Sequence, residues 1–191
     1  MSRKQLWLLA GGNGAGKTTF FRTQLQPLRM PFVNADDIAR EIFTGQEIER
    51  SYEAARLAEE MRAQLLRAGQ SFCAETVFSH PSKIDFVAAA RGLGYETILA
   101  FVHVSTISLN QARVHQRVEE GGHTVPMDKV ASRIPRTLKN IRRALPLFDE
   151  VRLLDNSSAS RPFELIATVK NGVLIDAMDP LPAWAAELLG Q

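Results

Sequence analysis

The chain has 191 residues, enough for one domain with a buried core, and its 45% apolar and 23% charged residues are typical of a globular protein. A formal net charge of only +2 argues against a strongly nucleic-acid-binding protein, and no apolar stretch is long enough to cross a membrane. Its single cysteine, Cys73, excludes an internal disulfide. We therefore expect one domain over residues 1–191, cytoplasmic, with no membrane or nucleic-acid partner.

Short apolar runs alternate with amphipathic segments along most of the chain. The runs predict buried parallel strands, and apolar positions three or four residues apart predict helices. Strands that alternate with helices form right-handed crossover units, so we expect a three-layer α/β fold around a mostly parallel sheet of five strands. The expected strands cover residues 5–10, 32–34, 71–75, 97–104 and 151–154, and the expected helices cover 17–26, 81–93, 108–120 and 127–145, with one long helix between 48 and 69.

The long helix carries a stripe of apolar residues at helical spacing, and Gly69 stands where a helix C-cap belongs. We expect this stripe to pack into the core. Its members are Ile48, Tyr52, Ala55, Ala58, Met61 and Leu65.

The end of the chain has a different pattern. Residues 163–170 alternate between apolar and polar, Asn171-Gly172 is a strong hairpin turn, and residues 173–175 return as a second strand. Residues 181–189 predict a short closing helix. We therefore expect a C-terminal β-hairpin beyond the five-stranded sheet.

A glycine-rich loop follows the first expected strand and precedes a helix. It matches the phosphate-binding pattern GxxxxGK[ST] at every fixed position. Glycines let backbone N–H groups turn inward around a phosphate, and the following helix presents its partly positive N-terminus. Lys17 can reach the β- and γ-phosphates, and the Thr18 hydroxyl can ligate Mg²⁺. The sequence therefore predicts a site for ATP and Mg²⁺ formed by Gly11, Gly12, Asn13, Gly14, Ala15, Gly16, Lys17, Thr18 and Thr19.

Acidic residues follow two expected strands, at the edge of the sheet where parallel α/β proteins bind ligands. Glu75, with Thr76 after it, can hold a magnesium-bound water or a substrate hydroxyl; the alternative is a glutamate that caps the next turn. Asp36 and Asp37 follow the second strand, where an aspartate can accept the proton of a substrate hydroxyl or cap the next helix. We favour Asp36 as the base and keep Asp37 as the alternative.

Basic residues crowd the segment 113–143, which a glycine pair at 121–122 divides. Such a break suits a mobile lid that closes over transferring phosphates and delivers arginine side chains to them. We expect a helical lid over about residues 113–143, with Arg117 and Arg133 as catalytic residues and Arg136 in contact with the substrate. The alternative for most of these charges is a solvated helix face.

Asn156 lies in the segment Asp155-Asn156-Ser157, directly after the fifth expected strand. The composition is typical of a turn, and the position also suits a loop beside a nucleotide. We expect Asn156 to contact the cofactor, with a plain turn as the alternative.

Taken together, these motifs resemble the zeta toxin family of P-loop kinases, in particular its short, stand-alone members. The resemblance implies a fold like that of small nucleotide kinases and transfer of a phosphoryl group from ATP to the sugar 3′-hydroxyl of UDP-N-acetylglucosamine. It also implies a toxin–antitoxin system with an antitoxin protein as partner. It extends from about Leu6 to Ser157 and rests on the segments 11–18, 33–39, 74–76, 121–126 and 155–157.

By this resemblance, Lys17 and Thr18 hold ATP and magnesium, and Asp36 is the catalytic base. Glu75 matches the substrate-contacting acid, and Arg117 and Arg133 match the arginines of the lid. The chain is shorter than the large zeta toxins and lacks the extended region that helps to enclose their sugar nucleotide. Another nucleotide or a small alcohol therefore stays open as the acceptor.

Two further functions stay open at this point. One is a regulatory ATPase module that binds nucleotide and controls a partner protein without a small-molecule acceptor. The other is a kinase for nucleic-acid ends, which the low net charge disfavours. The combination of Asp36, Glu75 and an arginine-rich lid favours the small-molecule kinase, since a pure switch does not need all three.

Overall fold

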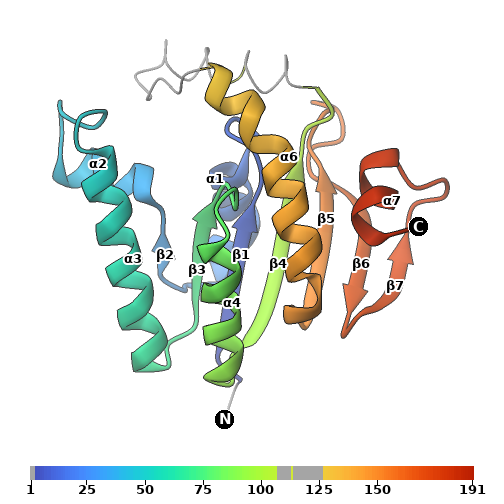
Figure 1. Cartoon of the computed structure of the whole chain (residues 1–191), viewed down its shortest axis with the longest axis horizontal. Helices are drawn as coiled ribbons and strands as arrows, with labels where there is room; N and C mark the ends of the chain where they lie inside the picture. The colour runs from blue at the N-terminus through green and yellow to red at the C-terminus, as the bar shows by residue number, and fades with distance from the viewer. Residues whose placement is uncertain (1–2, 107–112, 114–126) are drawn as a thin grey trace.

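The computed structural model describes residues 3–106, 113 and 127–191, which form a three-layer α/β sandwich (Figure 1). Seven strands in these ranges make one sheet in the order β2-β3-β1-β4-β5-β6-β7. The first five in this order pair in parallel, and β6 and β7 are antiparallel. The strands are β1 (Gln5–Ala10), β2 (Phe32–Val33), β3 (Phe72–Thr76), β4 (Glu96–His103), β5 (Glu150–Asp155), β6 (Glu164–Lys170) and β7 (Val173–Ala177).

The predicted sheet of five strands is too small by two. The predicted hairpin exists as β6 and β7, but it continues the sheet, because β6 pairs along β5 from Asp155↔Glu164 to Glu150↔Lys170. An unpaired edge on β5 would leave backbone N–H and C=O groups without partners, and the hairpin supplies those partners. The turn itself is as predicted: Asn171 and Gly172 have positive φ angles of 49° and 78°.

Helices cover both faces of the sheet (Figure 1). α1 continues into a π-helical turn (Phe21–Leu25) and packs with Trp7 and Leu9 of β1, whereas α3, α4 and α6 pack on the opposite face with Leu6 and Leu8. No helix within the described ranges is long and apolar enough to cross a membrane. The described helices are α1 (Lys17–Phe20), α2 (Ala35–Ile42), α3 (Ser51–Ala68), α4 (Ser82–Gly92), α6 (Met127–Ala144) and α7 (Ala183–Leu189).

The predicted core stripe of α3 is largely wrong. Tyr52 is 83% exposed, and Ile48, which precedes the helix, is also exposed. Small side chains let the helix approach the sheet closely, so the contact face follows the alanines rather than the largest apolar residues. Gly69 does end the helix, with φ 67°. The buried residues are Ala54, Ala58, Arg62 and Leu66.

The strand order creates the crevice in which the candidate site lies. β1 has β3 on one side and β4 on the other, so connections leave it in opposite directions. In such sheets ligands bind at the carboxyl ends of the strands, at this point of reversal. Apart from the arginines, the residues predicted for the site lie at the carboxyl ends of β1, β2, β3 and β5, in the last residues of the strands or in the loops and helix starts that follow them. The predicted helix over 108–120 lies outside the described residues apart from Arg113.

Candidate active site

The loop between β1 and α1 has a conformation that depends on its glycines. Gly16 has φ 95°, and a Cβ atom there would lie 2.5 Å from the side-chain amide nitrogen of Asn156. Gly11 has φ 150°, and a Cβ atom there would lie 2.3 Å from the carbonyl oxygen of Val102 in β4. The strand, loop and helix that the phosphate-binding pattern requires therefore follow one another in the structure.

Lys17 lies folded against this loop and is only 6% exposed. Its Nζ donates a hydrogen bond to the Gly12 carbonyl oxygen at 2.9 Å and lies 3.5 Å from Glu75 Oε1. The carbonyl and the carboxylate compensate the buried ammonium group. The ammonium thus lies at the loop, where a phosphate-binding lysine is needed.

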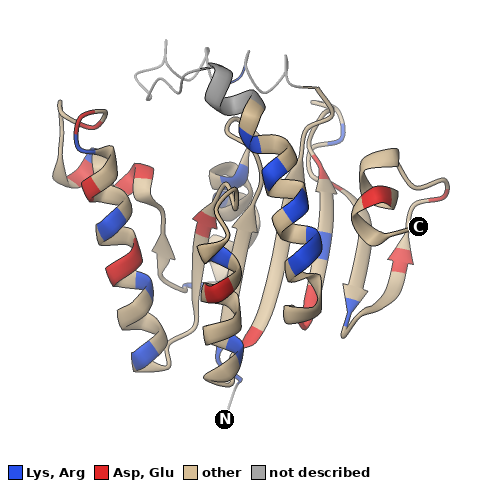
Figure 2. Ribbon diagram, viewed as in Figure 1, with Lys and Arg blue, Asp and Glu red and all other residues tan. Residues whose placement is uncertain are grey.

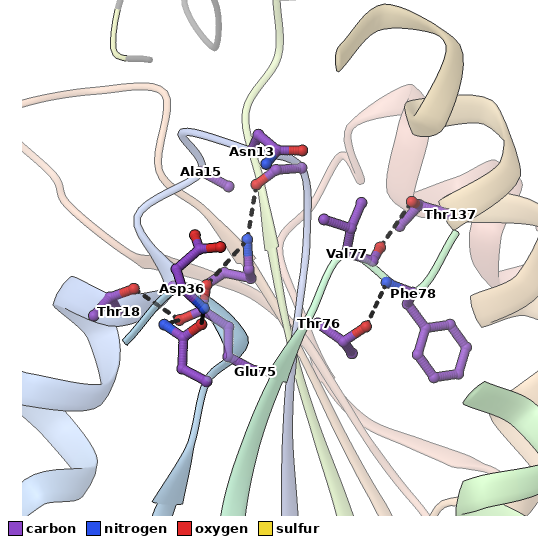
Figure 3. A network of polar contacts seen from close by, with 12 residues as sticks. Asn13, Ala15, Thr18, Asp36, Glu75, Thr76, Val77, Phe78 and Thr137 are labelled. Carbon is purple, nitrogen blue, oxygen red and sulfur yellow. Dashed lines mark hydrogen bonds and ion pairs between the residues drawn. The ribbon is translucent and has the colours of Figure 1, made fainter. Parts of the chain in front are cut away.

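Glu75 connects three polar side chains beneath the loop (Figure 3). Its Oε2 accepts hydrogen bonds from the Thr18 hydroxyl at 2.7 Å and from the Asn34 amide at 3.3 Å, and its Oε1 pairs with Lys17. The register of β3 against β1 places it there, because Glu75 lies opposite Leu9, next to the start of the loop. The structure therefore brings Glu75 together with Lys17 and Thr18, which the sequence reached only as separate motifs.

The two aspartates after β2 have different surroundings. Asp36 lines a cavity beside Glu75, whereas Asp37 forms an ion pair with Arg40 on the same helix. Neither caps the helix through its side chain. Asn34 does so, because its Oδ1 accepts a hydrogen bond from the Asp36 backbone N–H at 3.0 Å. The geometry thus favours Asp36 over Asp37 as the residue that reaches a ligand.

Two cavities meet at Lys17 and Glu75. The first, about 310 Å³ in volume, is lined by Asp36, Thr76 and residues of α3 and the loop after β3; we call it the Asp36 cavity. The second, about 540 Å³, is lined by residues of the loop after β5; we call it the Asn156 cavity. Gly14, Lys17 and Glu75 line both, so two ligands bound in the two cavities would adjoin at these residues.

Asn156 joins the loop after β5 to the glycine loop. Its Nδ2 donates a hydrogen bond to the Ala15 carbonyl oxygen at 2.8 Å, and its side chain is buried. Its carbonyl oxygen accepts a hydrogen bond from Arg113 at 2.8 Å. Phe163 packs edge-on against Phe20, with ring centroids 5.3 Å apart, and lines the same cavity. Asn156 therefore both borders the cavity and holds the glycine loop in place.

Residues 6–142 match the family model described as an AAA domain. This match covers more than two thirds of the chain. The chain belongs to this AAA domain family. An uncharacterized protein of Haemophilus influenzae is 28% identical over 140 residues, which cover 70% of this chain and 99% of that protein.

Solved structures share the fold of this AAA domain at low sequence identity. A chain of the PezAT chromosomal toxin–antitoxin system of Streptococcus pneumoniae is 19% identical, with a TM-score of 0.64 over 81% of this chain and 68% of that one. A chain of the AvrRxo1-ORF1:-ORF2 complex with ATP is 18% identical, with a TM-score of 0.75 over 98% of this chain but only 64% of its own length. A candidate kinase from Chloroflexus aurantiacus is 18% identical, with a TM-score of 0.63 over 84% of this chain and 92% of that one. The resemblance to zeta-toxin-like P-loop kinases is thus confirmed for the fold.

The arginines predicted for the lid of the AAA domain lie in different places. Arg133, on α6, lines the Asp36 cavity and approaches Asn13 Oδ1 at 3.4 Å. Arg136 is exposed and hydrogen-bonds to Ser132 of its own helix. Several basic positions follow one another along α6 (Figure 2). Arg117 lies outside the described residues. The sequence analysis assigned no separate role to Arg113, yet this residue lines the Asn156 cavity.

Two residues of α6 that the sequence analysis missed fix one wall of the Asp36 cavity. The Thr137 hydroxyl donates to the Val77 carbonyl oxygen at 2.8 Å (Figure 3). The Asn140 amide donates to the Phe78 carbonyl oxygen at 3.1 Å. Phe78 has a positive φ of 61°, and its N–H donates to the Thr76 hydroxyl at 3.0 Å. The signal that could have revealed them is a pair of polar residues three positions apart on the side of α6 that faces the sheet.

The residues present fit the magnesium ion that the sequence predicts. The described residues contain no cluster of three or more His, Cys, Asp or Glu side chains that could hold a metal alone. Magnesium in phosphoryl-transfer sites needs fewer, because phosphate oxygens and waters complete its octahedron. The Thr18 hydroxyl and the Glu75 carboxylate, whose oxygens lie 2.7 Å apart beside the glycine loop, provide the oxygen ligands such a site uses.

Proposed function

We propose that this AAA domain is an ATP-dependent phosphotransferase that acts on a hydroxyl group of a small molecule. The observation that carries the proposal is the meeting of the two cavities at Lys17 and Glu75. ATP would occupy the Asn156 cavity with its phosphates on the glycine loop. The acceptor would occupy the Asp36 cavity, so its hydroxyl and the γ-phosphate would adjoin at the shared residues.

The glycine loop and Lys17 would bind and orient the phosphates. Lys17 would exchange its bond to the Gly12 carbonyl oxygen for phosphate oxygens, and Thr18 and Glu75 would hold magnesium directly or through water. The metal, when bound, neutralises charge that develops on the phosphate oxygens. Positioning and charge neutralisation of this kind account for most of the catalysis in phosphoryl transfer.

Asp36 would act as the base. The acceptor oxygen bonds to the γ-phosphorus, the bond from that phosphorus to the bridging oxygen of ADP breaks, and the hydroxyl proton passes to the Asp36 carboxylate. Arg133, which lines the same cavity, would bind oxygens of the transferring group, as would Arg117. Arg136 stays a candidate substrate contact, although its hydrogen bonds to Ser132 would first have to break.

For the acceptor we propose a sugar nucleotide similar to UDP-N-acetylglucosamine, phosphorylated on a sugar hydroxyl. The support is the resemblance of the motifs to the zeta toxin family, together with the shared fold of the PezAT neighbour. The same support leads us to propose an antitoxin protein as a partner. The wall of charged and polar side chains around Asp36 suits a hydrophilic acceptor of this class.

A mass-spectrometric acceptor screen tests the proposal. Wild-type protein and Lys17→Ala are incubated with ATP, Mg²⁺ and a panel of UDP-sugars, nucleosides and small alcohols. We expect one UDP-sugar to gain a single phosphoryl group with the wild type only. Hydrolysis of ATP with no phosphorylated acceptor in the whole panel would instead favour the regulatory ATPase module.

A further inference from the structure

Arg62 is an exception among the buried polar side chains. Seven polar or charged residues are buried in the described part of the chain. Arg62 is 7% exposed, and within the described residues its guanidinium reaches no hydrogen-bond acceptor. The other six donate side-chain hydrogen bonds: Lys17, Asn34, Thr97, Thr137, Asn140 and Asn156.

The charge of Arg62 is also poorly compensated. Its ion pair with Glu59 is 3.7 Å long, and Glu59 is committed to Lys83 at 2.6 Å. One half-exposed carboxylate therefore serves two cations. Burial lowers the pKa of the Arg62 guanidinium, and Glu59 only partly opposes this effect. The Phe86 ring, 5.7 Å away, adds a weaker contact.

No Arg62 nitrogen is among the fully buried, unpartnered side-chain atoms of the described residues, so its unused donors keep some contact with solvent. Holding a largely buried arginine in this way is costly, because a charge removed from water needs a partner and its N–H groups need acceptors. An ordered water, an ion or a ligand can supply the partners that the fold does not. Arg62 and Lys83 both line the Asp36 cavity, as do Glu59 and His80. Their positive charge therefore borders the space assigned above to the acceptor.

We propose that Arg62 and Lys83 form an oxyanion-binding subsite in the Asp36 cavity, so that the hydroxyl acceptor also carries a phosphate or carboxylate group. The planar guanidinium suits either group, since it can donate two parallel hydrogen bonds to paired oxygens. The proposal rests on the proposed function, which places the acceptor in this cavity. The diphosphate of a sugar nucleotide is one group of the required chemistry.

Anion binding can be measured without knowing the acceptor. The glycine loop is first saturated with Mg²⁺ and a non-hydrolysable ATP analogue, and the protein is then titrated calorimetrically with inorganic phosphate or acetate at constant ionic strength. We expect the wild type to bind one further anion, and Arg62→Gln to weaken this binding roughly 10- to 100-fold. The anion that binds more tightly, phosphate or acetate, indicates whether the acceptor carries a phosphate or a carboxylate group.

Arg56→Gln is the matched control. Arg56 lies on the same helix, is largely exposed and pairs with Glu60, so its replacement should leave anion binding unchanged. Arg62→Met separates binding from folding: we expect loss of the anion with an unchanged or raised unfolding midpoint, because an uncompensated buried charge is removed. A lowered midpoint with intact anion binding would show that Arg62 is only a packing residue and would overturn the proposal.

The experiment distinguishes a failure of the anion subsite from a failure of the proposed phosphotransferase function. If the wild type fails to bind the ATP analogue, the phosphotransferase proposal fails on its own. Lys17→Ala, titrated with phosphate or acetate without nucleotide, then reports the Arg62 subsite directly. If neither the wild type nor Lys17→Ala binds phosphate or acetate, the proposed subsite is wrong.

Discussion

The two cavities at the glycine loop differ in charge. Among the described residues, four basic side chains and one acidic side chain line the Asn156 cavity, whereas four basic and three acidic side chains line the Asp36 cavity. A strong positive excess suits a nucleotide triphosphate, which carries several negative charges. A mixed lining suits a ligand on which a proton must be moved, because a base has to stand among the binding groups.

The cavities also differ in how the chain builds them. The Asn156 cavity lies between the glycine loop and the loop after β5, and one side-chain hydrogen bond from Asn156 joins these two loops. The Asp36 cavity needs α2, α3, the loop after β3 and α6 together. The Asp36 cavity can therefore change with substitutions on several elements while the Asn156 cavity stays the same.

The largest expected effect separates chemistry from nucleotide binding. We expect Asp36→Asn to lower the transfer rate by about 10²- to 10⁴-fold, because the amide cannot accept the hydroxyl proton. The dissociation constant for ATP should stay within about twofold, because Asp36 lines only the cavity opposite the nucleotide. Single-turnover kinetics and calorimetry measure the two quantities.

Asp37→Asn is the control for this variant, since Asp37 is adjacent in sequence but pairs with Arg40. We expect it to retain transfer within a few-fold of the wild type. Full transfer by Asp36→Asn together with a large loss in Asp37→Asn would reverse the assignment of the base.

Two variants with smaller expected effects test whether different hydrogen bonds stabilise the two cavities. Asn156→Ala leaves the Ala15 carbonyl oxygen without its buried donor, so we expect a loss of about 1–3 kcal/mol in the free energy of unfolding and roughly tenfold weaker ATP binding. Thr137→Val removes a comparable buried bond, to Val77, but on the other cavity. It should raise the KM for the acceptor and leave ATP binding unchanged.

Thermal unfolding, ATP calorimetry and acceptor kinetics on both variants decide the outcome. If both variants weaken ATP binding and raise the KM for the acceptor to the same extent, the two cavities act as one unit and are not supported separately.

Local patterns in the sequence predicted the glycine loop and its place between a strand and a helix. A phosphate-binding loop is a contiguous motif with glycines at fixed positions, and a parallel sheet places strand ends at one edge. These two facts place Lys17, Glu75 and Asp36 at the same edge of the sheet, whereas the ion pair between Lys17 and Glu75 is known only from the structure. The asparagine–glycine turn and the cap at Gly69 were predicted for the same reason, because each depends on local backbone conformation.

The surroundings of the Asp36 cavity depend on tertiary packing and were predicted less well. Asn34, rather than an aspartate, caps the helix after β2, and the Asn34 side chain also reaches Glu75 on the neighbouring strand. The hydrogen bonds of Thr137 and Asn140 join residues that are 60 and 62 positions apart, so their spacing in α6 could mark them as facing the sheet but could not identify their partners. Arg62 was overlooked because a charged residue in a helix is usually solvated, and its burial depends on tertiary packing beside Phe86.

The smallest expected effect concerns the positive excess of the Asn156 cavity itself. Arg22 lines this cavity but is exposed, so its attraction for the phosphates of ATP is screened by water and salt. We expect Arg22→Gln to weaken ATP binding about two- to fivefold at low ionic strength and to have little effect near 1 M salt. Calorimetry across a salt series measures this dependence. The KM for the acceptor should stay constant across the salt series, because Arg22 does not line the Asp36 cavity. An equal rise in this KM would mean that the charge of Arg22 affects ligands in both cavities.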